Sequence, residues 1–299
     1  MQYNNQPLVS IIMNCYNGET FLHESIKSVL SQTYENWELI FWDNRSEDKS
    51  AEIFKSFNDK RFKYYYASKH TLVSEARNEA IKRSSGEFIA FLDTDDLWEK
   101  DKLQLQIPLF EDPKVGVVYG NLFVINEKLN TKKIFLKKKK PKGFILDYLL
   151  KNYCVTLVTL VIRKSFLDNY QSSFDNSYHI IGDFDLMIRM STKYKFDCVE
   201  KPIASWRLHQ KNETLINKTM QIKELKTWYK TMMNYSIIFH NKNFSNINNL
   251  INNLEIANLI LENDLGKAWH KIKKMPYSLK KIKYLLALLL PNNFVKKFI

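Results

Sequence analysis

The stretch EFIAFLDTDDLW, residues 87–98, joins an apolar run directly to a group of carboxylates. Glu87 to Leu92 has the composition of a buried strand. Asp93, Asp95 and Asp96 follow within four positions, where their like charges repel one another. Burying even one carboxylate without a partner is costly. The pattern therefore indicates either a cation bound among the aspartates or a strand end that lies in water.

Three more strands are expected upstream of this one, separated by helices. Residues 9–13, 37–42 and 62–67 have strand patterns, and the segments between them carry apolar residues at helical spacing. Ser46 is expected to cap the second helix at its N-terminus, and Gly86 to end the third. Strands and helices that alternate at this spacing imply βαβ units, right-handed crossovers and an α/β fold with a mostly parallel sheet.

The remainder of the chain is mixed and then helical. Residues 116–125 and 155–162 are expected to be strands, and the lysine-rich segment 132–142 an exposed loop between them. From about Asn217 onward, apolar residues recur at helix spacing in a polar, asparagine- and lysine-rich background. We therefore expect two domains, an α/β domain over residues 1–215 and a helical, basic extension over 216–299.

Size and composition exclude several classes of protein. The 299 residues are 45% hydrophobic and 14% aromatic, which excludes a disordered chain. Cys15, Cys154 and Cys198 are odd in number, far apart and without a CxxC pair. They suit a reducing compartment and argue against a disulfide framework or a zinc site.

The formal charge of +13 is concentrated in lysine tracts. Nine lysines and no acids lie between Leu265 and Ile299, interleaved with leucine, isoleucine and phenylalanine as in interfacial helices. Either this tail is a solvated lysine face or it contacts an anionic membrane surface. Its longest apolar run, Tyr284 to Pro291, is far shorter than the roughly 20 residues of a spanning helix. With no secretory signal visible after Met1, we expect a cytoplasmic protein, peripheral on the inner face of the membrane.

The predicted strand ends are polar and rich in acids. They read NCYN, DNRSED and DTDD, and ligands of a parallel sheet collect at the carboxyl ends of its strands. Neither a glycine-rich dinucleotide fingerprint nor a GxxxxGK[ST] phosphate loop is present. The remaining way to hold a diphosphate is through a metal ion. Asp93 and Asp95 could present carboxylates to Mn²⁺ or Mg²⁺, which prefer oxygen ligands.

Four blocks of the sequence, in order, resemble the family-2 glycosyltransferases, enzymes with the GT-A fold that use nucleotide-sugar donors. The resemblance covers about residues 8–210 and leaves out the helical tail. The first two blocks are highly specific and the last two moderately so. They are VSIIMNCYNGETFLHESIKSVLSQTYENWELIFWDNRSEDKS, SEARNEAIKRSSGEFIAFLDTDDLW, IIGDFDLMIRM and WRLHQKNET.

The resemblance implies a role for each residue around the donor. Tyr16 and Asn17 would hold the base, Asp43 would read it, and Arg77 would face the ribose or phosphates or hold one of the DTDD acids. Asp93 would contact ribose or metal, and Asp95 the metal. Arg207 and His209, an R-x-H element, would lie near the diphosphate, with His209 a candidate metal ligand. For each of these residues the alternative is an ordinary structural or surface role.

The resemblance also places the catalytic base. Asp183, in IGDFDLMIRM, falls at the position of the carboxylate that deprotonates the acceptor hydroxyl, so the anomeric centre should invert. Asp185 is the rival candidate, and both could instead be charges favoured by a helix N-terminus. The family often has Glu immediately before this aspartate, whereas this chain has Gly182.

The function expected is therefore an inverting, divalent-metal-dependent glycosyltransferase. Its donor would be a UDP-sugar and its acceptor a glycan or lipid-linked glycan hydroxyl in bacterial surface polysaccharide assembly. A nucleotidyltransferase is an alternative, although its usual glycine-rich phosphate loop is missing. A non-catalytic basic protein that binds membrane or nucleic acid is another. No nucleic-acid partner is expected, because acids gather at the strand ends and the lysines lie elsewhere.

Overall fold

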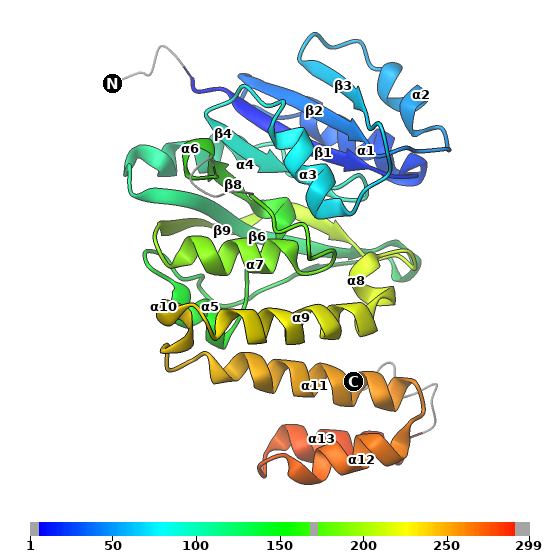
Figure 1. The fold of residues 1–299 in the computed structure, drawn as a ribbon. Coiled ribbons are helices and arrows are strands. Elements are labelled where there is room, and N and C mark those ends of the chain that lie inside the picture. Colours follow the sequence, from blue (N-terminus) through cyan, green and yellow to red (C-terminus); the bar gives the residue numbers. More distant parts are fainter. Residues whose placement is uncertain (1–5, 168–172, 291–299) are drawn as a thin grey trace. The chain divides into compact units, whose positions relative to one another are not determined.

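The computed structural model describes residues 6–167 and 173–290 and divides into two compact units (Figure 1). The first unit is Met1–Gln210 and contains the sheet, and the second is Lys211–Ile299. In the described part of the second unit every regular element is a helix. The division falls at residue 210, whereas the sequence pattern placed the domain boundary at residue 215.

The described strands form one mixed sheet. Its order is β3-β2-β1-β4-β8-β6-β9-β5, with β7 paired to β6. The half made by β3, β2, β1 and β4 is entirely parallel, and β6 also runs parallel to β9, whereas the other pairs are antiparallel. The strands are β1 (Val9–Cys15), β2 (Trp37–Asp43), β3 (Phe62–Tyr66), β4 (Phe88–Phe91), β5 (Leu97–Trp98), β6 (Val115–Asn126), β7 (Thr131–Ile134), β8 (Val161–Arg163) and β9 (Lys195–Arg207).

The parallel half brings the polar strand ends together. Cys15 at the end of β1 is in register with Asp43 at the end of β2, and Asp43 with Tyr66 at the end of β3. β4 pairs with β1 on its other side, Ile12 beside Phe91. The segments that follow these strands therefore leave the sheet at one edge, as expected for a parallel sheet.

The helices of the first unit pack on this sheet. Val9, Ile11 and Met13 of β1 share a buried core with Leu22 and Ile26 of α1. α3 packs on β1 and β2. The helices are α1 (Glu19–Leu30), α2 (Ser50–Lys55), α3 (Val73–Ile81), α4 (Lys102–Gln106), α5 (Leu146–Lys151), α6 (Lys164–Leu167) and α7 (Gly182–Ser191), with 3₁₀ turns η1 (Ile107–Glu111), η2 (Glu127–Leu129) and η3 (Leu157–Thr159).

The second unit has its own small core. Side chains of α11, α12 and α13 form a buried cluster that includes Ile256, Ile260, Ala268, Ile272 and Tyr284. The helices of this unit are α8 (Glu213–Ile216), α9 (Lys218–Met232), α10 (Ser236–Phe239), α11 (Ser245–Leu261), α12 (Leu265–Lys274) and α13 (Leu279–Ala287). None of the described helices is both long and apolar enough to cross a membrane. The last part of the basic tail, residues 291–299, lies outside the described residues.

One predicted strand is largely wrong. Of residues 155–162 only the end belongs to β8, and Leu157–Thr159 form the 3₁₀ turn η3. Side chains, not a neighbouring strand, donate hydrogen bonds to the backbone carbonyls here. Trp98 Nε1 donates to the carbonyl of Val158, and Gln106 Nε2 donates to that of Thr159. Apolar composition alone cannot distinguish a buried turn from a buried strand.

Both predicted helix caps are also wrong. α2 begins at Ser50, not after Ser46, and α3 ends at Ile81, well before Gly86. At position 86 a Cβ atom would lie 2.6 Å from the backbone nitrogen of Ser10. This glycine therefore allows the chain to pass close to β1 and does not end a helix.

The lysine-rich segment 132–142 is mostly exposed, as expected, with two differences. Its first residues belong to β7, which pairs with β6. Lys140 is buried, and its ammonium donates to the carbonyl of Cys154. Burial lowers the pKa of Lys140.

All three cysteines are buried and free.

Candidate active site at the ends of the parallel strands

The segments that follow β1 and β2 are tied to each other by hydrogen bonds. The Asn17 backbone N–H donates to Ser46 Oγ at 3.0 Å, and the Asn17 side-chain oxygen accepts from the N–H of Glu47 at 2.9 Å. Asn17 has a φ of 53°, the left-handed region that asparagine tolerates better than most residues. Ser46, expected as a helix cap, thus joins two loops at the edge of the sheet.

Asp43, the predicted reader of the donor base, is fully buried. Its Oδ1 accepts from the Ser46 N–H and its Oδ2 from the Tyr64 hydroxyl, both at 2.7 Å. Burial and the neighbouring Asp43 charge raise the pKa of Tyr64. Tyr64 therefore remains a neutral donor, and Asp43 is held in one orientation at the end of β2.

Tyr16, by contrast, is half exposed and presents an aromatic face at the end of β1. Its ring lies 4.2 Å from the His70 ring, centroid to centroid. His70 Nδ1 lies 2.9 Å from the carbonyl oxygen of Asn44, so the end of β2 and the segment before α3 meet here. Tyr16 and His70 together make a platform on which a flat base could stack.

The DTDD turn gathers predicted residues from three separate segments. Arg77 Nη2 on α3 lies 3.0 Å from Asp93 Oδ1. His209 Nε2, after β9, lies 2.8 Å from Asp95 Oδ2. Both acids keep partly exposed side chains, 38% for Asp93 and 29% for Asp95. Two aspartates thus remain accessible at the carboxyl edge of the sheet.

Asp96, the third acid of the turn, is buried. Its Oδ1 accepts the backbone N–H of Arg207 at 3.0 Å. Burial and the neighbouring charges of Asp95 and Asp93 raise the pKa of Asp96 well above its ordinary value. Burial and the charge of Asp93 also raise the pKa of Asp95, against the opposing effect of His209. Burial and the like charges of the neighbouring aspartates thus both disfavour the charged forms of Asp95 and Asp96.

Arg207 lies inside the protein, with 2% of its side chain exposed. Its Nε donates to the carbonyl of Asp95 at 3.0 Å and its Nη2 to Glu24 Oε2 at 2.6 Å. The guanidinium carbon is 4.5 Å from the centre of the Phe21 ring. These contacts join β9, the DTDD turn and α1.

The three predicted metal ligands are only partly brought together. Asp95 and His209 meet, whereas Asp93 contacts Arg77. Within residues 6–167 and 173–290 no three His, Cys, Asp or Glu side chains form a group that could hold a metal. Mg²⁺ and Mn²⁺, however, are commonly held by one or two carboxylates together with substrate phosphates. The two partly exposed carboxylates of Asp93 and Asp95, close enough to repel each other, fit such an ion.

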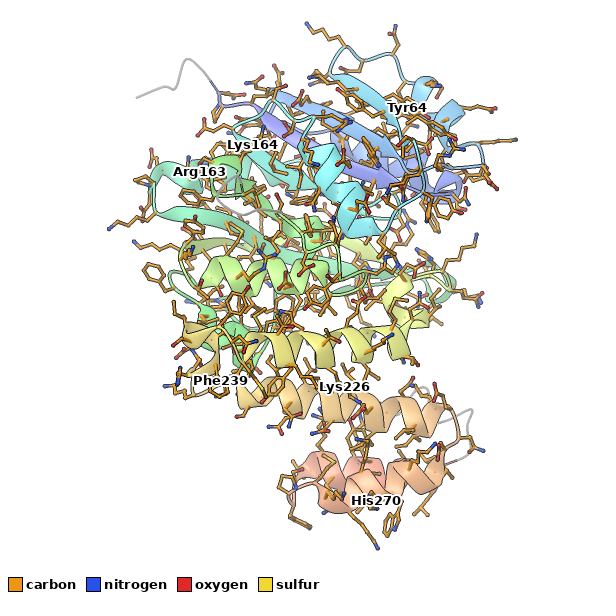
Figure 2. All side chains as sticks on the ribbon, in the orientation of Figure 1. Tyr64, Arg163, Lys164, Lys226, Phe239 and His270 are labelled. Carbon is orange, nitrogen blue, oxygen red and sulfur yellow. The ribbon has the colours of Figure 1, made fainter. Side chains whose placement is uncertain are left out.

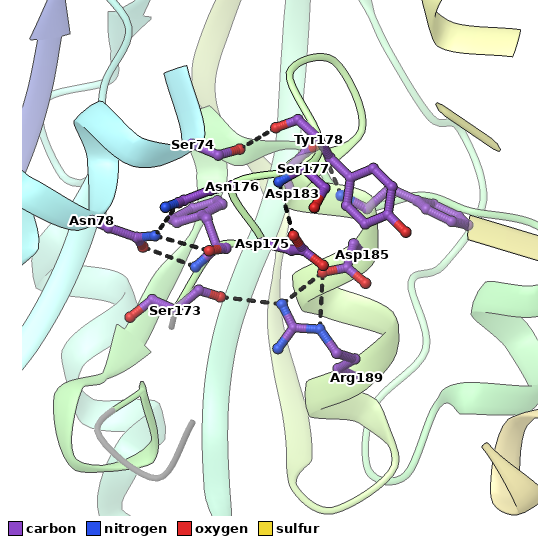
Figure 3. A network of polar contacts seen from close by, with 12 residues as sticks. Ser74, Asn78, Ser173, Asp175, Asn176, Ser177, Tyr178, Asp183, Asp185 and Arg189 are labelled. Carbon is purple, nitrogen blue, oxygen red and sulfur yellow. Dashed lines mark hydrogen bonds and ion pairs between the residues drawn. The ribbon is translucent and has the colours of Figure 1, made fainter. Parts of the chain in front are cut away.

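The predicted bases Asp183 and Asp185 lie in the first turn of α7, in different surroundings (Figure 3). Asp185 is buried, and its Oδ2 accepts from Arg189 Nε at 2.9 Å and Nη2 at 2.6 Å. Asp183 is partly exposed, and its Oδ1 accepts the N–H of Phe184. Burial and the charge of Asp93 raise the pKa of Asp183, while the charge of Arg77 opposes them. The charges of Asp93 and Arg77, at the DTDD site, thus act on Asp183.

The segment before α7 connects it to α3, the helix that carries Arg77. Ser74 Oγ donates to the carbonyl of Tyr178, and Asn78 Nδ2 to that of Phe174 (Figure 3). Arg189 Nη2 donates to the carbonyl of Ser173 at 3.2 Å. This network fixes the helix that carries Asp183 relative to the helix that carries Arg77.

Gly182 replaces the glutamate that was expected before Asp183, and its surroundings give the reason. A Cβ atom at this position would lie 2.6 Å from Ser74 Oγ. Any side chain there would turn Ser74 away from the Tyr178 carbonyl. Glycine at position 182, where the family often has glutamate, thus preserves the hydrogen bond that links α3 to the segment before α7.

Several residues of the site were not singled out from the sequence: His70, Tyr64, Glu24, Ser74 and Tyr153. The Tyr153 ring packs edge-on against Phe184, with centroids 4.9 Å apart. The Tyr153 hydroxyl is buried and has no hydrogen-bond partner among the described residues. Burial and the charge of Asp183 raise its pKa well above the ordinary value. No local motif marks these residues, because their partners are far away in the sequence.

The model of glycosyl transferase family 2 matches residues 10–193, more than half of the chain. The chain belongs to this family. Its first unit is a glycosyltransferase domain, and the resemblance inferred from the four sequence blocks is confirmed.

A curated relative agrees with this assignment, and two solved structures share the fold. The E. coli UDP-Glc:alpha-D-GlcNAc-diphosphoundecaprenol beta-1,3-glucosyltransferase WfgD is 38% identical over 167 residues, which are 56% of this chain and 64% of WfgD. The chain thus matches less than two thirds of that relative. S. aureus TarS 1-349 in complex with UDP-GlcNAc has a TM-score of 0.67 at 15% identity, covering 97% of this chain and 83% of TarS. Mannosyltransferase PcManGT from Pyrobaculum calidifontis, in complex with GDP-Man and Mn2+, has a TM-score of 0.58 at 14% identity, covering 98% and 89%.

The predicted fold class is confirmed by these structural neighbours. A GT-A sheet flanked by helices forms the family-2 domain, and a helical C-terminal region follows it. The parallel half of the sheet is the part that the βαβ pattern anticipated, whereas the antiparallel strands β5, β7 and β8 make the whole sheet mixed.

Proposed function

We propose that this protein is an inverting, divalent-metal-dependent glycosyltransferase that moves a sugar from a nucleotide-sugar donor to a hydroxyl acceptor. The observation that carries the proposal is the DTDD turn. There, the partly exposed carboxylates of Asp93 and Asp95 meet Arg77 and His209 at the carboxyl edge of a family-2 domain. Two neighbouring carboxylates with an arginine and a histidine beside them suit a cation and a diphosphate bound together.

Asp93, Asp95 and His209 would hold the Mn²⁺ or Mg²⁺ ion. When bound, the ion would neutralise charge on the diphosphate leaving group as a Lewis acid. Arg77 Nη2 lies 3.0 Å from Asp93 Oδ1, and its guanidinium would also attract the phosphates of the donor. PcManGT, a structural neighbour, is in complex with GDP-Man and Mn2+, which supports divalent metal use here.

Asp183 is the proposed base for the acceptor hydroxyl. It is the more exposed of the two acids on α7, and Asp185 is committed to Arg189. An aspartate of ordinary pKa is ionised at neutral pH. Because one carboxylate removes the acceptor proton while the acceptor oxygen displaces the diphosphate, the anomeric configuration inverts. Tyr153, whose buried hydroxyl has no hydrogen-bond partner among the described residues, is proposed to position the start of α7 through its contact with Phe184.

The donor base is proposed to lie at the ends of β1 and β2. Tyr16 would stack on it, backed by His70, and Asn17 would shape the loop around it. Asp43, already holding two hydrogen bonds, has further lone pairs with which to accept a ring N–H. WfgD is named for UDP-Glc and TarS was solved with UDP-GlcNAc, so we propose a UDP-sugar donor.

Arg207 is proposed to act differently from the role that the resemblance implied. Its donors go to Asp95 and Glu24 inside the protein, so we assign it to positioning the DTDD turn. His209, two residues on, keeps the proposed contact with the metal through its position beside Asp95.

The acceptor is proposed to be a glycan on a lipid carrier, in bacterial surface polysaccharide assembly. WfgD is named for a diphosphoundecaprenol acceptor, which supports this class. The helical unit exposes Trp269, Tyr277 and Leu279 among lysines, the composition of an interfacial surface. We therefore propose that the protein works on the cytoplasmic face of the membrane, attached through its basic helical region.

The test is a thermal shift of the purified protein with UDP, GDP and TDP, each with and without MnCl₂. Binding to the native state must raise the melting temperature. We expect UDP with Mn²⁺ to stabilise the wild type and Asp95→Asn to lose this effect. Asp112→Asn, the same change at a surface acid paired with Lys195, should keep it. A protein that no nucleotide stabilises under either condition would contradict the proposed function.

A further inference from the structure

The helical unit contains a pocket between α9, α11 and α12. Its volume is about 810 Å³, within the range of small-molecule sites. The contributing residues of α9 recur at helical spacing and so share one face. Among the described residues that line it, five are lysines and one is an acid. The lining is Thr219, Ile222, Lys223, Lys226, Thr227, Lys230, Glu255, Asn258, Leu259, Gly266, Lys267, His270 and Lys271.

Glu255 organises two of these lysines from different helices. Its carboxylate accepts from Lys226 Nζ on α9 and, at 2.8 Å, from Lys271 Nζ on α12. Only 13% of the Glu255 side chain is exposed. Burial alone would raise its pKa, but the hydrogen bonds from both lysines lower it. Glu255 is therefore a charged anchor that holds two ammonium groups at the wall of the pocket.

Three further cationic or titratable side chains have no such partner. In the part of the chain that the structure describes, no ion pair or hydrogen bond engages the side chain of Lys223, Lys230 or His270. Lys267 is paired with Asp264 at 2.7 Å. The pocket lining thus contains more lysines than Glu255 can pair with. Lys226 of α9 and His270 of α12 are labelled in Figure 2.

Gly266 leaves one side of the pocket open. A Cβ atom at this position would have no heavy atom within 4 Å, so the glycine is not required by close packing. Its backbone is also outside the left-handed region. The open side gives a ligand access to the lysines, and the apolar side chains of Ile222 and Leu259 would face its less polar part.

We propose that this pocket binds a phosphate-bearing anion, a phosphate monoester or a diphosphate. Several ammonium groups around one cavity suit a group with a multiple negative charge, and hydrogen bonds to charged oxygens are the strong ones. The lysines come from α9 and α12, so a bound phosphate would join two helices of the unit. The site is separate from the DTDD turn in its residues and does not depend on the proposed transferase function.

The pocket differs from an ordinary solvated lysine face in its buried acid, although Lys223, Lys226, Lys230 and Lys267 are exposed. Lysines on an ordinary face need no buried acid between them. Here, a largely buried glutamate holds Lys226 and Lys271 in place, and the neighbouring lysines line a cavity. The pairing with Glu255 therefore offsets the repulsion between Lys226 and Lys271 in the folded unit.

The first experiment measures the binding of inorganic pyrophosphate to the full chain by calorimetry in EDTA, which suppresses metal-dependent binding at the DTDD turn. The double variant Lys223→Ala/Lys230→Ala removes two charges without removing a described partner. Since each 1.4 kcal/mol is tenfold in affinity, the loss of two charge-assisted contacts should weaken binding by at least about tenfold. Gly266→Trp, which fills the pocket, should weaken binding similarly while the circular dichroism spectrum stays unchanged.

The matched control is Lys274→Ala/Lys280→Ala. It removes the same charge from the same unit at two exposed lysines outside the pocket. Binding to a pocket predicts that this control keeps the affinity of the wild type. Equal weakening by both double variants, or no binding of pyrophosphate by the wild type, would overturn the proposal.

A second arm identifies the source of the phosphate. Vesicles of phosphatidylcholine with and without phosphatidic acid are sedimented with each variant, in the presence and absence of pyrophosphate. If pyrophosphate displaces the protein from phosphatidic acid vesicles, and the pocket variants fail to bind them, the phosphate is that of a lipid headgroup. If pocket-dependent binding is seen only with pyrophosphate, the ligand is a soluble phosphate compound. Nucleotide stabilisation with Mn²⁺ reports separately on the transferase site.

Discussion

At the scale of single residues, the two aspartates of α7 differ in burial and in hydrogen-bond partners, and these differences indicate different roles. Asp183 and Asp185 are two positions apart in the same first turn. Asp185 is buried against Arg189, which makes it part of the fold. Asp183 is partly exposed, so its carboxylate is accessible to a substrate. Its raised pKa means that the folded protein disfavours its charged form.

Exchanging each acid for its amide should separate the two roles. We expect Asp183→Asn to lower kcat by about 10² to 10⁴, the usual contribution of a positioned base. Its melting temperature should not fall, because the surroundings of Asp183 disfavour the charged form that the amide replaces. Asp185→Asn should instead lower the free energy of unfolding by about 1 to 3 kcal/mol, since a charged hydrogen bond to Arg189 is lost. The measurements are the rate of sugar transfer and the thermal unfolding of both variants. If Asp185→Asn lost activity without losing stability while Asp183→Asn kept its activity, Asp185 would be the base.

The raised pKa of Asp183 also predicts a pH dependence. The base works only as a carboxylate, so activity should fall as the pH drops through the pKa of the folded protein. Because burial raises that pKa above 3.8, the acidic limb of kcat/KM should lie at a higher pH than an ordinary aspartate would give. A kcat/KM profile of the wild type tests this. An acidic limb at or below pH 3.8 would contradict the assignment.

At the scale of elements, the DTDD turn is held from both sides by α1 and β9. The Ser25 hydroxyl of α1 lies 2.8 Å from the carbonyl oxygen of Thr94 and 2.6 Å from that of Asp96. Arg207 of β9 contacts Asp95 and α1 from the other side. The position of the carboxylates thus depends on packing between elements that are far apart in the sequence.

Arg207→Ala should therefore destabilise the domain and loosen the turn. Loss of the buried hydrogen bonds should cost about 1 to 3 kcal/mol in the free energy of unfolding. It should also weaken nucleotide binding in the presence of Mn²⁺. Lys201→Ala is the control, because it breaks an exposed pair with Asp101 and should change stability by less than about 1 kcal/mol. Urea unfolding measures both, and nucleotide affinity retained in full by Arg207→Ala would argue against its positioning role.

At the scale of the whole molecule, charge is distributed unevenly along the chain. Acids gather in the segments that follow the parallel strands of the first unit, as in DNRSED and DTDD. The tract from Leu265 to Ile299, by contrast, contains nine lysines and not a single acid. The helical unit therefore carries a strongly basic region, whereas the candidate active site is acidic.

This division predicts membrane binding that depends on salt. Exposed charges are screened over about 10 Å at 0.1 M salt and over about 3 Å at 1 M. We therefore expect the protein to sediment with phosphatidylglycerol vesicles at low ionic strength and to be released as salt is added, while phosphatidylcholine vesicles leave it in solution. Binding that is absent at low salt, or equal for both lipids, would contradict a basic membrane-facing surface.

Much of this protein could be determined from the sequence by itself. The apolar runs before NCYN, DNRSED and DTDD, with helical spacing between them, identify the parallel half of the sheet, because alternation and periodicity are local properties. The same blocks identify the family, and Asp93, Asp95 and Asp183 as candidates, because motif residues are close in the chain.

Only the tertiary structure decided which groups meet. It placed Arg207 inside the protein, set His70 beside Tyr16, bound Asp185 to Arg189 and left Asp183 partly exposed. It also turned most of residues 155–162 from a strand into a 3₁₀ turn and assembled a lysine-lined pocket from three helices. Burial and pairing depend on residues that are distant in the sequence, and these distances exist only once the chain has folded.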